Sequence, residues 1–199
     1  MTSMTIEWSG NGVARITTAV EALAGTQKHK ALQRAVNHVG AKTFTQTKRS
    51  LAKQMGVTQK ALTEGGRTLT AHPAYGGDLS YHIRTGGRAM RLKAFKPNPS
   101  EPGARPPSLT AAPWGNRRAF KRAFWIGAGA KWGLGAKSEA NIYMRLGKKR
   151  FPVKSLYGPN LNKELVKDTV AANFFAIVRR DLPARVAHEI NVITRGIVA

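Results

Sequence analysis

The sequence predicts an α+β fold with N-terminal helices, a central, mostly antiparallel β-sheet with long loops, and two C-terminal helices. Apolar residues recur at helical spacing in the N-terminal part (1–64), alternate with polar residues in the middle (79–157), and return to helical spacing at 160–199. Glycines and prolines gather in the middle part, where they favour strands and loops over helices. We expect these three parts to form a single domain over residues 1–199.

The N-terminal part begins with a short alternating segment and continues as a helix. Met4, Ile6 and Trp8 alternate with polar residues and predict a short strand. Asn11 can cap a helix, and apolar residues then recur at helical spacing as far as Gly25.

A second, longer helix is predicted from Gln27 to Met55, where Gly56 ends it. Thr58 can cap a short helix that runs through Leu62. The long helix carries one mainly apolar stripe, which consists of Val36, Gly40, Phe44, Thr47, Leu51 and Met55.

The β part is predicted to start with a hairpin. Residues 79–83 alternate apolar and polar side chains, Gly86-Gly87 is a turn signal, and residues 90–94 alternate again. The proline-rich segment 97–113 predicts an extended arm, either ordered by contacts or mobile. Residues 117–126 are compatible with a helix or a strand, and the glycines that follow favour a strand.

The last strands are predicted on either side of a basic turn. Residues 140–146 alternate cleanly and pair with 151–156 across the turn formed by residues 147–150. Gly158-Pro159 then ends the β part. The first C-terminal helix is expected to stop near Asp181, which can cap a second helix with Pro183 in its first turn.

The charge of the chain predicts an anionic partner. Lys and Arg number 33 against 10 Asp and Glu, which gives a formal net charge of +23 and a pI near 11.3. Between residues 79 and 150 the only acids are Glu101 and Glu139. Such an excess repels itself and favours a polyanion or an acidic protein as partner. Large aliphatic side chains are sparse, so we expect neighbouring chains to stabilise part of the fold.

No pattern in the sequence supports catalysis or a cofactor. There is no cysteine, and the five histidines form no closely spaced pair suited to a metal. The glycine-rich segment 127–138 lacks the spacing of a phosphate-binding loop. The acids do not cluster as a metal-dependent nuclease would require. We therefore expect a protein that is not an enzyme, without cofactor or metal.

The sequence also lacks membrane-spanning and signal patterns. No apolar run approaches the roughly 20 residues of a membrane span. The N-terminus lacks the charged-then-apolar layout of a signal peptide. We expect a protein that is made in a cytoplasm and has no membrane partner.

Basic residues of the β part are the candidate contacts to DNA or to an acidic protein. Those of 117–122 are interleaved with Phe120, Phe124 and Trp125, which could stack on bases or, as we favour, belong to the core. Contacts of this kind would hold a partner without reading a sequence. The candidates are Arg84, Arg88, Arg91, Lys93, Arg117, Arg118, Lys121, Arg122, Lys148, Lys149 and Arg150.

Several short segments, taken in their order along the chain, resemble segments of one known protein family. Ala31-Leu-Gln-Arg-Ala-Val-Asn-His-Val39 is similar to an early Ala-rich helix of that family, and residues 60–64 and 67–71 resemble the lysine-rich segment that follows it. The basic turn with its Phe-Pro-Val step (147–153), Arg179-Arg-Asp-Leu-Pro183 and the closing amphipathic helix follow in the same order. The family that these segments resemble is the minor tail protein Z and tail-completion family of tailed bacteriophages. The segments 97–113 and 127–135 are longer than its pattern requires.

This resemblance implies a structural virion protein near the head–tail junction, made in the cytoplasm of a bacterial host. Members of the family form homo-oligomeric rings, commonly of six subunits, between the tail terminator and the neck proteins around the DNA channel. A ring of this kind would bring the basic residues to DNA or to acidic neighbours. The alternative is a free, non-specific nucleic-acid-binding protein, and an enzyme is the third possibility.

Overall fold

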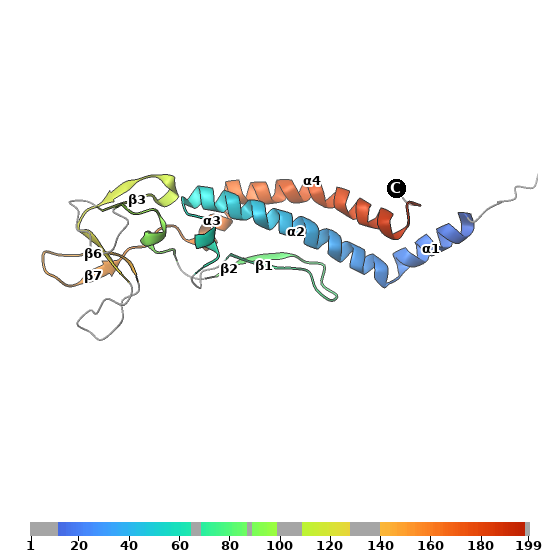
Figure 1. Ribbon diagram of the computed structural model, residues 1–199, viewed down its shortest axis with the longest axis horizontal. Coiled ribbons are helices and arrows are strands. Elements are labelled where there is room, and N and C mark those ends of the chain that lie inside the picture. The colour runs from blue at the N-terminus through green and yellow to red at the C-terminus, as the bar shows by residue number, and fades with distance from the viewer. Residues whose placement is uncertain (1–11, 65–68, 87–88, 99–108, 128–139, 198–199) are drawn as a thin grey trace, which may run out of the picture. The chain divides into compact units, whose positions relative to one another are not determined.

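The computed structural model describes residues 12–64, 69–86, 89–98, 109–127 and 140–197. The chain has helices at both ends and strands in the middle (Figure 1), so the predicted α+β class is confirmed. The strand predicted at Met4–Trp8 lies outside the described residues, as does most of the glycine-rich segment. The chain divides into two compact units, a helical unit and a sheet unit.

The helical unit consists of residues 1–44, 71–83 and 174–199. It contains α1 (Gly12–Ala24), the first part of α2 (Thr26–Met55) and the longer, C-terminal part of α4 (Asp168–Ile193). Within this unit α2 and α4 lie side by side, as Figure 1 shows and two interhelical ion pairs require. Helices α1 and α2 begin and end within one or two residues of the bounds that the sequence predicts.

Small residues of α2 form the centre of the helical unit. Ala31, Ala35 and Val39 are buried and recur every four residues on one side of the helix. The loop after residue 72 is fastened to the same helix, because the side-chain amides of Gln33 and Asn37 both donate to the carbonyl of Ala74. Short side chains at the core positions allow close packing of helix, loop and second helix.

The sheet unit consists of residues 45–70 and 84–173. In it β3 (Leu109–Ala111) pairs antiparallel with β4 (Arg118–Phe120). A second, three-stranded antiparallel sheet has the order β5 (Ala123–Ile126), β6 (Asn141–Arg145) and β7 (Val153–Ser155). The strands predicted at 117–126 and on both sides of the basic turn are thus confirmed, with the first divided into β4 and β5.

Large apolar side chains fill the core of the sheet unit. They come from the end of α2, from both sheets, from the C-terminal segment 161–170 and from the 3-10 helices η1 (Lys60–Leu62) and η2 (Leu92–Ala94), while η3 (Pro113–Gly115) adds the buried Pro113. Among the described residues the fully buried large ones are Leu51, Met55, Leu62, Leu92, Phe95, Leu109, Ile142, Leu161 and Val170. This core is larger in side-chain volume than that of the helical unit.

Gly56 ends α2 as predicted, and the reason is visible in its backbone. Its φ of +76° is a left-handed conformation that other residues rarely adopt. A β-carbon at this position would also lie 2.4 Å from the backbone nitrogen of Gly115. The C-terminal end of α2 and the turn of η3 can therefore approach each other only because residue 56 is glycine.

The hairpin predicted for residues 79–94 is wrong. The strand β2 (His82–Thr85) pairs with β1 (Leu69–His72), and Leu92–Ala94 is a 3-10 helix. The backbone amides of Met90 and Leu92 donate to carbonyls of residues 159 and 156, so this segment lies along the end of the β part. Alternation at 90–94 is misleading because Leu92 and Phe95, three residues apart, are the fully buried pair.

The division of the C-terminal helices also differs from the prediction. The chain has two of them, α3 (Leu161–Leu165) and α4, but they separate near residue 166 rather than at Asp181. Helix α4 runs through Pro183 without a break. A proline removes one helical hydrogen bond, and the rest of this long helix remains intact around it. Asp181 accepts bonds from Arg180 and Lys42 and caps no helix.

Part of the segment predicted as a proline-rich arm is packed structure. Leu109 and Ala111 are fully buried in β3, and residues 113–115 form η3. Residues 99–108 lie outside the described part of the chain. The C-terminal third of the predicted arm therefore belongs to the packed sheet unit.

Candidate functional site

The three-stranded sheet brings two basic turns to one of its ends. The turn at Lys121-Arg122 leads into β5, whose first residue, Ala123, is opposite Met144 near the end of β6. The turn 147–150 connects β6 to β7, and Arg145 is opposite Val153. The amide of Arg145 donates to the carbonyl of Arg122 at 3.4 Å, which fixes the first turn beside the second.

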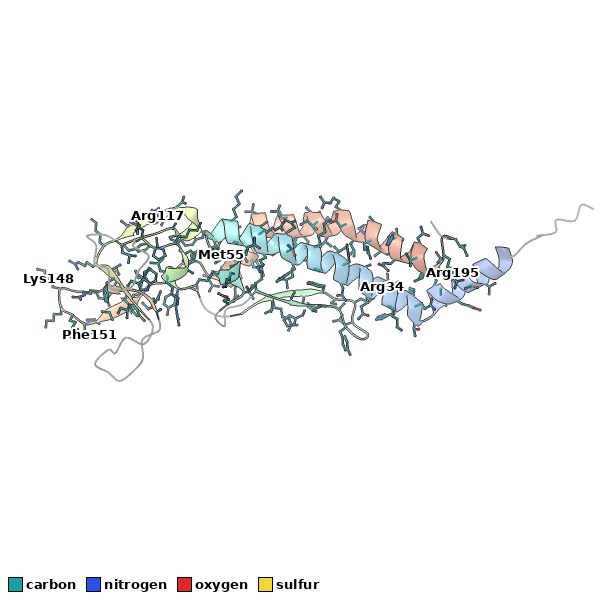
Figure 2. The ribbon with its side chains drawn as sticks, viewed as in Figure 1. Arg34, Met55, Arg117, Lys148, Phe151 and Arg195 are labelled. Atoms are coloured by element: carbon teal, nitrogen blue, oxygen red, sulfur yellow. The ribbon has the colours of Figure 1, made fainter. Side chains whose placement is uncertain are left out.

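We call this group of cations the basic sheet end. All its members except Arg145, which is half-buried, are exposed. Figure 2 labels Lys148 and Phe151 on the turn between β6 and β7. The basic sheet end consists of Lys121, Arg122, Arg145, Lys148, Lys149, Arg150 and Lys154.

Two arginines of the basic sheet end stack on aromatic rings. The guanidinium carbon of Arg145 lies 5.3 Å from the ring centre of Phe124, and that of Arg150 lies 5.6 Å from Phe151. Such stacking favours a fixed guanidinium plane and leaves its N–H groups available to oxyanions. Phe120, Phe124 and Trp125 are half-buried, which agrees with the structural role favoured for them, whereas Phe151 is exposed.

No acidic residue is found among the described residues of the segment 84–159, which contains the basic sheet end. Between residues 84 and 159 the only acids are Glu101 and Glu139, and both lie outside the described segments. Neighbouring like charges raise the electrostatic potential above this end of the sheet. The arrangement suits a partner with closely spaced negative charges.

The remaining sequence candidates are not brought to the basic sheet end by the strand register. Arg84 is exposed on β2, while Arg91 and Lys93 are half-buried beside or within η2. Arg117 donates to the hydroxyl of Thr110 at 2.9 Å and to the carbonyl of Lys96 at 3.3 Å, so it holds a loop against β3.

Arg118 is exposed on β4, and Arg88 lies outside the described residues. The sequence analysis did not name Arg145 and Lys154 as candidates. Both are basic residues of the strands predicted on either side of the turn, and their nearness to that turn is the pattern that could have identified them. The structure therefore divides the candidates into a group that the sheet gathers and a group with separate positions.

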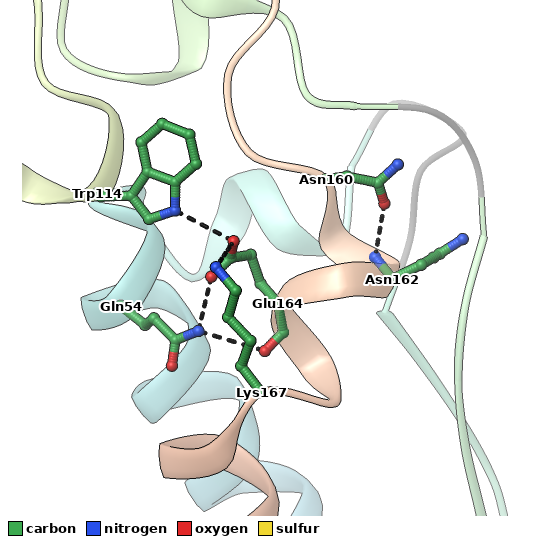
Figure 3. A network of polar contacts seen from close by, with 6 residues as sticks. All are labelled: Gln54, Trp114, Asn160, Asn162, Glu164 and Lys167. Atoms are coloured by element: carbon green, nitrogen blue, oxygen red, sulfur yellow. Dashed lines mark hydrogen bonds and ion pairs between the residues drawn. The ribbon is translucent and has the colours of Figure 1, made fainter.

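A buried carboxylate in the sheet unit has a structural role (Figure 3). Glu164 is 3% exposed and accepts hydrogen bonds from Gln54 at 2.7 Å, Trp114 at 3.1 Å and Lys167 at 2.6 Å. Burial raises the pKa of Glu164, but the bonds from Lys167, Gln54 and Trp114 outweigh it and hold the pKa below its usual value. A carboxylate saturated in this way is a poor general base. It joins the end of α2, η3 and α3.

Neither a metal site nor a membrane helix is found in the described part of the chain. No three His, Asp or Glu side chains come together there as metal ligands. None of the helices in the described segments combines the length and the apolar character needed to cross a bilayer.

No protein-family model, curated protein or solved structure matches this chain. The resemblance to tail-completion proteins therefore stays a prediction. The class of protein that the fold defines is an α+β protein with a charge-paired helical unit and a basic sheet end.

Proposed function

We propose that the chain is a structural virion protein of a tailed bacteriophage. In this proposal it is a minor tail or tail-completion protein near the head–tail junction, where a homo-oligomeric ring links the tail terminator to neck proteins around the DNA channel. The basic sheet end contacts the phage DNA or the acidic surface of a neighbouring virion protein. The role is assembly, without catalysis.

One observation carries the contact role: the sheet of β5, β6 and β7 gathers seven cations at one of its ends, five from two turns and two from strands β6 and β7, with no described carboxylate on residues 84–159. Surface cations with such a bias hold a partner through charge and do not read a sequence. The order of motifs resembling the tail-completion family supports the position in the virion.

The test is replacement of Lys148, Lys149 and Arg150 by serine in a phage that carries this gene. We expect head–tail joining and infectivity to fall at least tenfold, because the exposed turn loses its charge, while the purified protein keeps its fold. A matched control removes three exposed lysines of α2 instead, at positions 28, 30 and 53, with glutamine to preserve the helix. Unchanged infectivity of the serine variant would remove the turn from the proposed mechanism.

The second candidate is a free, non-specific nucleic-acid-binding protein. The stacked pairs Arg145–Phe124 and Arg150–Phe151 favour it, since they present guanidinium groups to phosphates. Purified virions separate the two functions. The assembly protein is retained in them at a fixed copy number, a multiple of six for a six-fold ring, whereas a free binder is lost on purification.

A further inference from the structure

A groove in the helical unit has the composition of an oxyanion site. Its volume is about 280 Å³, several times the roughly 30 Å³ that one water occupies. From α2 it is lined by His38, Val39 and Lys42, and from α4 by Asp181, Ala184, Arg185 and His188. Every lining residue belongs to the helical unit.

The charged groups around this groove leave an excess of positive charge. Asp181 accepts from Lys42 and from Arg180, each at 2.6 Å. Glu189, next to the groove residue His188, accepts from Arg34 at 3.0 Å and also from Arg185. Two carboxylates are thus shared among four cations, so two positive charges remain uncompensated before either histidine is protonated.

The ion pairs position the cations without using up their donors. An ammonium has three N–H donors and a guanidinium five, and the bonds to carboxylates occupy only some of them. The side chain of Lys42 is 50% exposed and that of Arg185 is 30% exposed. His38 and His188 are exposed and add ring nitrogens, while Val39 and Ala184 supply apolar wall.

We propose that the α2–α4 groove binds a phosphate group, with Lys42, Arg185, His38 and His188 as donors. A phosphate monoester carries about −1.5 to −2 charges near neutral pH. In the lining, Lys42 and Arg185 outnumber the single carboxylate, Asp181, and Arg34 and Arg180 share the neighbouring carboxylates from outside the lining. Arginine and lysine together are the usual protein donors to such groups. The phosphate can be a small monoester or the terminal phosphate of a nucleic acid. This inference is independent of the proposed function.

The first experiment titrates the protein with inorganic phosphate at constant ionic strength and follows the five histidine imidazoles by NMR. His38 and His188 are expected to shift and saturate together. His29, His72 and His82 serve as internal controls, since none of them lines the groove. Equal, non-saturating shifts at all five histidines would overturn the proposal, because they would reflect general charge screening.

Two leucine substitutions on the same helix then test the place of binding. Ala184→Leu fills the groove without changing charge, and Ala187→Leu is the matched control at an exposed alanine outside the lining. We expect at least tenfold weaker phosphate binding for A184L and wild-type binding for A187L. Equal binding by both variants would refute the site. If A184L unfolds, His188→Gln is used, with the same tenfold loss expected.

The third experiment distinguishes the two sources of phosphate. A short oligonucleotide with a 5′-phosphate is compared with the same oligonucleotide lacking it, each against the wild type and A184L. A nucleic-acid end is indicated if the 5′-phosphate strengthens binding at least fivefold in the wild type and not in A184L. If both oligonucleotides bind equally and inorganic phosphate binds saturably in the first experiment, the groove is assigned to small monoesters.

Discussion

In the helical unit each of the two carboxylates on α4 has two cations beside it, whereas the basic sheet end presents seven cations and no described carboxylate nearby. The first arrangement joins α2 to α4, since Arg34 and Lys42 reach across to Glu189 and Asp181. The second makes no ion pair with a carboxylate of the described residues, and its side-chain stacking contacts there are the packing of Arg145 on Phe124 and of Arg150 on Phe151.

This difference separates charges that stabilise the fold from charges available to a partner. When the carboxylate of a partly buried, shared salt bridge is removed, unpaired cations are left behind and the fold is destabilised. Exposed cations without acids around them lower folding stability slightly through repulsion. The sheet end therefore makes physical sense as a contact surface, and the helical ion pairs as part of the architecture.

The largest effect is expected on DNA binding when the sheet end loses charge. Each phosphate contact contributes about 0.9 to the slope of log affinity against log salt, so the triple serine variant at 148–150 should lower the slope by roughly 2 to 3. At about 0.1 M salt this corresponds to an affinity loss of roughly two orders of magnitude. A fluorescence-anisotropy salt series measures both quantities.

The control for this series is the triple glutamine variant at Lys28, Lys30 and Lys53, which loses the same charge from α2. It should keep a slope within about one of the wild type. Equal slopes for the two variants would mean that total charge, and not the sheet end, governs binding. If the DNA affinity of the wild type does not change with salt concentration, the partner of the basic sheet end is an acidic protein and not DNA.

The next effect is on the stability of the helical unit. Glu189 is 4% exposed and holds Arg34 and Arg185, so Glu189→Ala should lower the free energy of unfolding by about 2–3 kcal/mol. Urea denaturation followed by circular dichroism measures the change. Glu21→Ala, at an exposed position of α1, is the control and should change it by less than about 0.5 kcal/mol. Similar losses for both would contradict a special role of the shared pair.

Acid should weaken the helical unit for the same reason. Burial raises the pKa of Glu189, but the bond from Arg185 and the charges of Arg34 and Arg185 lower it below its usual value. Bonds from Arg180 and Lys42 lower the pKa of Asp181. A depressed folded-state pKa gives stability that is present above the unfolded pKa of about 4 and is lost as the pH falls through the folded value.

We therefore expect the urea concentration at the unfolding midpoint to decrease as the pH is lowered below about 5. The decrease should be less steep in Glu189→Gln than in the wild type. Parallel pH profiles for the two proteins would show that Glu189 does not contribute to acid sensitivity. The sheet unit has its own acid-sensitive carboxylate, Glu164, whose pKa is also lowered. Tryptophan fluorescence from Trp114, which donates to Glu164, helps to follow that unit separately.

The success and failure of sequence reasoning follow from what local patterns encode. The extents of α1 and α2 and the strand–turn–strand at 140–156 were predictable, because periodicity and Gly56 are local signals. The pairing of β2 with β1 was not, since strand partners depend on long-range hydrogen bonds that no short pattern specifies. Pro183 suggested a helix start, yet the surrounding helix tolerates the loss of one bond.

For the site, the sequence identified the basic turn at 147–150 and named Lys121 and Arg122 as candidates, but it placed these two in a strand and did not predict their turn or its meeting with the other. Lys121-Arg122 and residues 148–150 are far apart in the chain and become neighbours only through the register of β5, β6 and β7. The same register adds Arg145 and Lys154. The Glu164 network was invisible for a similar reason, because its donors come from residues 54, 114 and 167.

The smallest expected effect is on the folding stability of the triple serine variant itself. Lys148, Lys149 and Arg150 are exposed in a turn, so their loss should change the free energy of unfolding by less than about 0.5 kcal/mol. The contact of Arg150 with Phe151 at an exposed site contributes at most about 0.5–1 kcal/mol, and relief of repulsion opposes its loss. Urea denaturation at two salt concentrations checks this. A loss above about 1 kcal/mol would place the turn among the stabilising charges and remove the distinction between the two regions.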